Sequence, residues 1–109
     1  MAHLIKDLLQ QPGIIRCMAV GRLMHHNLLQ IIGMHGGYHG IWFDLEHCNT
    51  SISDLEICAM AARSQGLDTF CRVAPTDYAL VTRCIEAGSS GVMAAQINSA
   101  EQAEEFVRP

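Results

Sequence analysis

The chain has 109 residues, enough for one small domain, and half of them are hydrophobic, which favours a packed core over disorder. The net charge of −4 argues against nonspecific binding to nucleic acid, and no hydrophobic run approaches the roughly 20 residues that span a bilayer. The five cysteines are odd in number and include no Cys-x-x-Cys pair. We therefore expect neither a disulfide framework nor a structural zinc site, and we expect the protein in the cytoplasm.

Hydrophobic runs alternate with segments of helical spacing along the whole chain. We predict strands over residues 14–20, 40–46, 69–73 and 91–96. We predict helices over residues 1–11, 24–35, 53–65 and 77–87, and a further helix from residue 100 onward. Capping boxes predict helix starts at Ser53 with Glu56 and at Ser99 with Gln102, and Thr76 is predicted to cap the helix that follows it.

This alternation with short connections predicts an α/β fold with parallel strands and right-handed crossovers. A (β/α)8 TIM barrel takes about 250 residues, so residues 1–109 would form a single partial domain, the first four βα units of a barrel. A half-barrel leaves two strand edges exposed. Three arrangements remain open: the chain pairs with another half, belongs to a longer protein, or closes as a small flavodoxin-like sheet.

Two carboxylates and an imidazole, Asp44, Glu46 and His47, stand at the carboxyl end of the second predicted strand. In α/β folds the carboxyl end of a strand faces the active site. Asp44 and Glu46 are two residues apart, so they share one face, where paired charges need a cation, a metal or a dipole to balance them. His47 has the chemistry of a general base. The alternative interpretation is a strand end that has reached solvent, with hydrated acids.

Arg72 is the one charged residue in the third predicted strand, near its carboxyl end. Its guanidinium would meet Asp44 and Glu46 across adjacent strand ends or bind an anionic substrate, and the alternative is a structural salt bridge. Glu86 lies late in the helix over residues 77–87. A solvated acid is the better interpretation of Glu86 on the residues alone, although the helix dipole disfavours an acid there.

Four segments, in this order and spacing, resemble the motifs of the class II pyruvate aldolases. They are WFDLEH at 42–47, CRVAP at 71–75, EAGSSGVM at 86–93 and NSAEQA at 98–103. The group includes 2,4-dihydroxyhept-2-ene-1,7-dioate aldolase and 2-dehydro-3-deoxyglucarate aldolase, in the phosphoenolpyruvate/pyruvate barrel superfamily. The resemblance covers residues 14–109 and implies the N-terminal half of a (β/α)8 barrel.

The resemblance also implies a reaction, the reversible cleavage of 4-hydroxy-2-oxo acids to pyruvate and an aldehyde through a pyruvate enolate. It implies a divalent metal (Mg²⁺, Mn²⁺ or Co²⁺), a 2-oxo acid and an aldehyde as substrates, and a homo-oligomer, with no nucleic-acid or membrane partner. A cation fixed near the enolate oxygen suits this chemistry, because negative charge develops on that atom.

Residue by residue, the resemblance implies that His47 is the base that removes a methyl proton from pyruvate. Arg72 would bind the substrate and hold its ketone oxygen. Glu86 falls where the family has an acid, usually aspartate, that pairs with the catalytic histidine, and Asp44 matches a nearby active-site acid. The family's metal ligands come from later strands, so we expect no metal ligand in this chain and no aldolase activity from it alone.

Two further functions fit the same residues. The first is a non-catalytic half-barrel that works as an assembly or regulatory module, which the missing metal half motivates. The second is a small flavodoxin-like domain that binds a metal or an anion through Asp44, Glu46 and Arg72.

Overall fold

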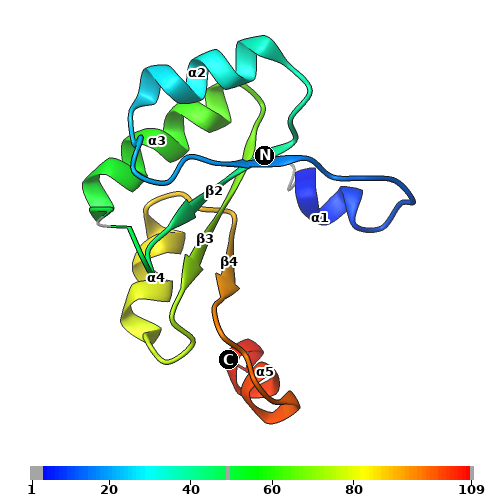
Figure 1. Cartoon of the computed structure of the whole chain (residues 1–109), viewed down its shortest axis with the longest axis vertical. Coiled ribbons are helices and arrows are strands. Elements are labelled where there is room, and N and C mark those ends of the chain that lie inside the picture. The colour runs from blue at the N-terminus through cyan, green and yellow to red at the C-terminus, as the bar shows by residue number, and fades with distance from the viewer. Residues whose placement is uncertain (1–3, 49, 109) are drawn as a thin grey trace.

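The computed structural model describes residues 4–48 and 50–108. Over these residues, helices and strands alternate (Figure 1). The helices are α1 (Leu4–Leu8), α2 (His26–His35), α3 (Ile52–Ser64), α4 (Tyr78–Glu86) and α5 (Ala100–Val107). The strands are β1 (Cys17–Ala19), β2 (Gly40–Asp44), β3 (Asp68–Val73) and β4 (Gly91–Ala94).

The four strands form one parallel sheet in the order β1-β2-β3-β4. Each strand therefore lies beside the next one in the chain, as in one half of a β/α barrel. A flavodoxin-like sheet has the order 2-1-3-4-5 instead, so that alternative is wrong. The predicted α/β half-barrel with parallel strands is confirmed.

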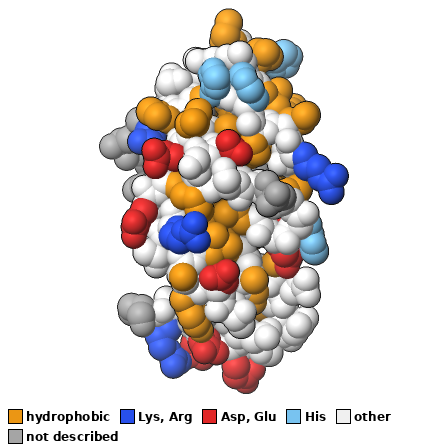
Figure 2. Space-filling model, turned by 90° about the vertical axis from the view of Figure 1, so that its left-hand side faces the viewer, with side chains coloured by type: hydrophobic (Ala, Val, Ile, Leu, Met, Phe, Trp, Pro, Cys, Tyr) orange, Lys and Arg blue, Asp and Glu red, His pale blue; other side chains and the backbone are white. Residues whose placement is uncertain are grey.

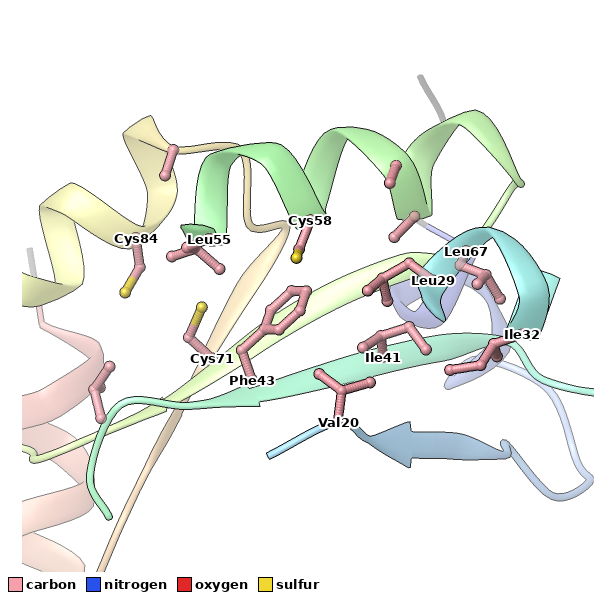
Figure 3. Packing of buried hydrophobic residues seen from close by; sticks show 14 residues of the cluster. Val20, Leu29, Ile32, Ile41, Phe43, Leu55, Cys58, Leu67, Cys71 and Cys84 are labelled. Carbon is pink, nitrogen blue, oxygen red and sulfur yellow. The ribbon is translucent and has the colours of Figure 1, made fainter. Parts of the chain in front are cut away.

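The core lies between the sheet and the helices on one of its faces, and Figure 3 shows it from close by. Ile41 and Phe43 of β2 point toward the helices, where Leu29 of α2 lies over Ile41 and Cys58 of α3 lies over Phe43. All four side chains are buried. Each removes hydrophobic surface from water, which stabilises the packing of α2 and α3 on the sheet.

The opposite face of the sheet is much more open. Burial alternates along β3, where Thr69, Cys71 and Val73 are buried and the residues between them are only half-buried. Phe70 and Arg72 therefore point away from the helices, because successive side chains of a strand alternate between its faces. This open face corresponds to the interior of a complete barrel.

The short helix α1 is formed only at Leu4–Leu8, and residues 1–3 of the predicted helix lie outside the described part of the chain. The backbone N–H of Ile5 donates a hydrogen bond to Asp68 Oδ2 at 3.0 Å. A Cβ atom added to Gly40 would lie 2.7 Å from Ile5 Cδ1. Glycine at this position therefore allows α1 to approach the amino end of β2.

Two predicted helix caps are wrong. Helix α3 begins at Ile52, and its N-cap is Ser51, whose hydroxyl accepts a hydrogen bond from the Asp54 backbone N–H at 3.0 Å. The predicted cap, Ser53, lies inside the first turn. Helix α4 is likewise capped by Asp77 rather than by Thr76. In both cases several capping residues stand close together in the sequence, and the residue at which the helix begins decides which of them is the cap.

The cap predicted for the last helix is confirmed. Ser99 accepts a hydrogen bond from the Gln102 backbone N–H at 3.2 Å. The side chain of Gln102 accepts one from the Asn98 backbone N–H at 2.7 Å, one residue before the position that an ideal capping box uses.

Candidate active site

Asp44 and Arg72 meet at the carboxyl edge of the sheet, because the register of β2 with β3 places them side by side. Arg72 Nη2 donates to Asp44 Oδ2 at 2.6 Å, and Arg72 Nε donates to Asp44 Oδ1 at 3.2 Å. This two-pronged geometry is the strong form of an arginine–carboxylate pair. The contact that the sequence predicted between these strand ends is formed.

Asp44 also organises the loop that follows β2. Its Oδ1 accepts the backbone N–H groups of Glu46 at 2.9 Å and His47 at 3.2 Å. The Arg72 guanidinium, helped by these two N–H groups, holds the pKa of Asp44 well below its usual range. Because the residue is only 5% exposed and its oxygens are occupied, Asp44 acts as a permanent anion that shapes the site.

Arg72 keeps donors for a second ligand. Asp44 takes two of its N–H groups, and the guanidinium has others that a substrate oxygen can accept. Its carbon Cζ lies 5.0 Å from the centroid of the Trp42 ring, within the range of a cation–π contact. The hydrogen bond to Asp44 raises the pKa of Arg72, so its positive charge is permanent.

Glu46 lies between the imidazole and the guanidinium. Its Oε1 is 2.8 Å from His47 Nε2 and 3.7 Å from Arg72 Nε. The Glu46 side chain is only 13% exposed, whereas the His47 side chain is 64% exposed. The structure thus brings together Asp44, Glu46, His47 and Arg72, which the sequence singled out, and leaves the imidazole accessible to a small molecule.

A cavity of about 400 Å³ adjoins His47. Its lining residues come from the loops after β1 and β2 and from the start of α3, and they are Arg22, Met24, His47, Cys48, Thr50 and Asp54. Arg22 and Gln96, which contacts Glu46, were not identified from the sequence. The available signal was their position, because each follows a strand that ends at this edge of the sheet.

Glu86 does not join this group. It is exposed at the last turn of α4. Four residues later, the backbone N–H of Ser90 donates a hydrogen bond to Thr69 O, so this part of the chain lies near the amino end of β3. Helix α4 runs from the carboxyl edge of β3 back to the amino edge of β4 (Figure 1). Glu86 and His47 therefore lie at opposite edges of the sheet, and within this chain they do not pair.

The described residues do not fit a metal centre by themselves. Over residues 4–48 and 50–108, no three His, Cys, Asp or Glu side chains are grouped so that they could hold an ion. Asp44, the most buried acid here, already binds a guanidinium and two N–H groups. In the same part of the chain, no helix is both long enough and hydrophobic enough to cross a membrane.

The sheet order and the position of the site define the fold as one half of a β/α barrel, and solved structures share it. The HpcH/HpaI aldolase from Desulfitobacterium hafniense DCB-2 matches with a TM-score of 0.88 and 22% identity, over 98% of this chain and 41% of that one. Citrate synthase SbnG matches with a TM-score of 0.85 and 17% identity, over 97% of this chain and 42% of that one.

Macrophomate synthase matches with a TM-score of 0.74 and 18% identity, over 95% of this chain and 36% of that one. This chain therefore spans about two fifths of the length of the structures that it matches. No protein-family model and no curated protein matches it. The resemblance to aldolase barrels that the sequence motifs indicated is confirmed at the level of the fold.

Proposed function

We propose that this segment supplies the proton-transfer half of an active site that makes or breaks a carbon–carbon bond beside a 2-oxo acid such as pyruvate. The observation that carries the proposal is the position of His47 and Arg72 on the carboxyl edge of a sheet with the fold of an aldolase barrel. Barrel enzymes place their catalytic groups at this edge.

In the proposed reaction, the imidazole of His47 takes a proton from the methyl group of the 2-oxo acid. The electron pair of the broken C–H bond forms the enolate, and negative charge develops on the ketone oxygen. The N–H groups of Arg72 that Asp44 does not occupy stabilise that oxygen. The enolate carbon then attacks the carbonyl carbon of an aldehyde, the C=O electron pair moves onto the aldehyde oxygen, and that oxygen takes up the proton that His47 had accepted. The reverse sequence cleaves the product.

The proposal includes a divalent ion held outside this segment. The described residues form no metal group, and the aldolase resemblance assigns the ligands to later strands of a barrel. The active assembly therefore joins this segment to further strands, which also cover its open face and edges. We expect that assembly to be a homo-oligomer, as the resemblance implies.

The test is hydrogen exchange at the methyl group of pyruvate in D₂O, followed by proton NMR. The protein is a polypeptide that joins this segment to the remaining strands of an aldolase barrel, with Mg²⁺ or Mn²⁺ present. We expect His47→Ala to lower the exchange rate about 10²–10⁴-fold, because a positioned base contributes that much. The matched control is His35→Ala, which removes an exposed histidine at the last position of α2, away from His47.

Exchange at the parental rate in His47→Ala would show that another group is the base. Exchange that is lost in both variants would point to a folding defect, which circular dichroism detects separately. Loss in His47→Ala with retention in His35→Ala supports the proposal.

A non-catalytic assembly module is the second candidate function. The observation that favours it is the ion pair of Arg72 with Asp44, in which the two opposite charges balance each other without any ligand. In that case the charges only fix the ends of β2 and β3, and the open strand edges are the functional feature. The oligomeric state of the isolated chain distinguishes the two functions.

A further inference from the structure

Gln96 has an unusual backbone conformation for its residue type. Its φ angle is +54°, and among the described residues other than glycine it is the one in the left-handed region. Residues other than glycine reach this region at a conformational cost, which the surrounding structure must offset. Gln96 comes two residues after β4 ends, at the same edge of the sheet as His47.

The side chain of Gln96 explains what this backbone conformation achieves. Its Nε2 donates a hydrogen bond to Glu46 Oε2 at 3.1 Å, across a separation of 50 residues in the sequence. The other carboxylate oxygen, Oε1, lies 2.8 Å from His47 Nε2. The two oxygens of Glu46 are therefore divided between Gln96 and His47, and the carboxylate joins them.

This contact favours one of the two tautomers of a neutral His47 ring. An ionised carboxylate only accepts hydrogen bonds, so a ring nitrogen 2.8 Å from it is expected to bear hydrogen, and that nitrogen is Nε2. The lone pair of the neutral ring then lies on Nδ1. Within the part of the chain that the structure describes, no side chain or backbone group is hydrogen-bonded to Nδ1.

We propose that Gln96 is a positioning residue for His47, acting through Glu46, and that Nδ1 is the atom of His47 that accepts the proton. Glu46, rather than Glu86, is then the acid that orients the base. The inference rests on the proposed function for the identity of the reaction, but the contacts that carry it do not depend on that function.

The proton step balances with these groups alone. A carbon-bound proton of the substrate moves to Nδ1, and the electron pair of the C–H bond remains on the substrate as the enolate. The imidazolium keeps its Nε2 proton, and Nε2 lies 2.8 Å from Glu46 Oε1, so the new positive charge lies against a carboxylate. When the proton returns to carbon, the ring regains the same tautomer and is ready for another cycle.

The test reads the tautomer of His47 directly, by two-bond ¹H–¹⁵N correlation spectra of the ¹⁵N-labelled 109-residue chain at about pH 8, where an ordinary imidazole is neutral. We expect the Nε2–H form in the parent chain. Gln96→Gly removes the amide while allowing the positive φ, so it should fold at least as well as the parent. We expect it to raise the fraction of the Nδ1–H form about twofold to fivefold, the effect of weakening one hydrogen bond.

Gln96→Glu provides a second variant with a side chain of the same length. Its carboxylate would repel Glu46, so we expect the same change in tautomer. The matched control is Gln10→Gly, which removes an exposed glutamine from the turn after α1 and should leave the tautomer unchanged. A parental tautomer ratio in both Gln96 variants would overturn the inference.

Exchange kinetics separate this inference from the proposed function. In a barrel that exchanges pyruvate protons, we expect Gln96→Gly to lower kcat about tenfold with little change in KM, because the residue orients the base without touching the substrate. If the tautomer responds to Gln96 but no barrel containing this segment exchanges pyruvate, the proposed function fails and the positioning role stands. If exchange occurs and the tautomer does not respond, only the positioning role fails.

Discussion

At the scale of single residues, Asp44 shows how one carboxylate organises a site. It receives the guanidinium of Arg72 from the neighbouring strand and two backbone N–H groups from its own loop. The loop therefore turns where the strand ends, and this turn delivers Glu46 and His47 to the edge of the sheet. The acid that looked like a catalytic candidate in the sequence is better explained as the residue that holds the others.

Replacement of Asp44 by asparagine tests this role. Asparagine still accepts backbone N–H groups but leaves Arg72 without a counter-ion, so we expect the free energy of unfolding at neutral pH to fall by about 1–3 kcal/mol. Urea denaturation followed by Trp42 fluorescence measures the change. The control Asp7→Asn removes an exposed aspartate of α1 and should have little effect. Equal stability of the two variants would contradict the role of Asp44.

The same pair predicts how stability depends on pH. Arg72 and the loop N–H groups lower the pKa of Asp44 in the folded state, so the unfolded chain binds this proton more readily. The stabilisation is complete above the ordinary aspartate pKa of about 3.9 and is lost as the pH falls through the lower folded-state value. We expect Asp44→Asn to flatten the decline of stability below about pH 4, and acid titration of the unfolding midpoint checks this.

At the scale of helices and strands, the chain shows a competition among neighbouring capping residues. Ser51 and Ser53 are both suitable N-caps, and Glu56 made Ser53 the better candidate by pattern. The structure instead begins α3 at Ile52, which places the hydroxyl of Ser51 within 3.0 Å of the Asp54 N–H. Leu55 and Cys58 are then buried against the sheet, so packing decides the phase of the helix.

A pair of substitutions distinguishes the two caps. Ser51→Ala removes the hydroxyl that accepts the Asp54 N–H, and we expect it to lower the free energy of unfolding by about 1 kcal/mol. Ser53→Ala lies on the exposed surface of the first turn and should be neutral or slightly stabilising, because alanine is the better helix former. Chemical denaturation of both variants measures the difference. A larger effect at position 53 would restore the capping box that the sequence predicted.

At the scale of the whole molecule, the sheet has helices on one face and an open face opposite. Phe70 and Arg72 lie on that open face, and the outer edges of β1 and β4 have no neighbouring strand among the described residues. The surface is also rich in hydrophobic groups, and Figure 2 shows such side chains gathered near the middle of one face among acidic and basic ones. Surfaces of this kind favour association with further chains or segments.

Self-association of the isolated chain follows from this surface. We expect it to bind a hydrophobic dye and to associate in multi-angle light scattering, and we expect Phe70→Lys to reduce both, because it places a charge on the open face. The control Ile31→Lys changes an exposed residue of α2 and should reduce them less. A stable oligomer of defined size supports the assembly module, whereas irregular aggregates indicate a segment that needs the remaining strands of a barrel.

Local rules account for what the sequence by itself determined. Hydrophobic periodicity located the elements, and short connections between alternating elements required parallel strands. Parallel strands bring their carboxyl ends to one edge, so Arg72 had to approach Asp44 and Glu46. The direction of α4 also follows from this topology. Because α4 returns to the amino edge of the sheet, Glu86 at its end lies apart from His47 within this chain, although the motif resemblance implied that the two residues pair.

The tertiary structure decided the rest. Contact between Gln96 and Glu46 joins residues 50 positions apart, and it depends on a backbone conformation that no local pattern marks. The choice of Ser51 as cap depends on how α3 packs, and the contact between His47 and Glu46 depends on the turn that Asp44 holds. Such features arise from the register and packing of distant segments, whereas strand order and the location of the site follow from the direction of the chain.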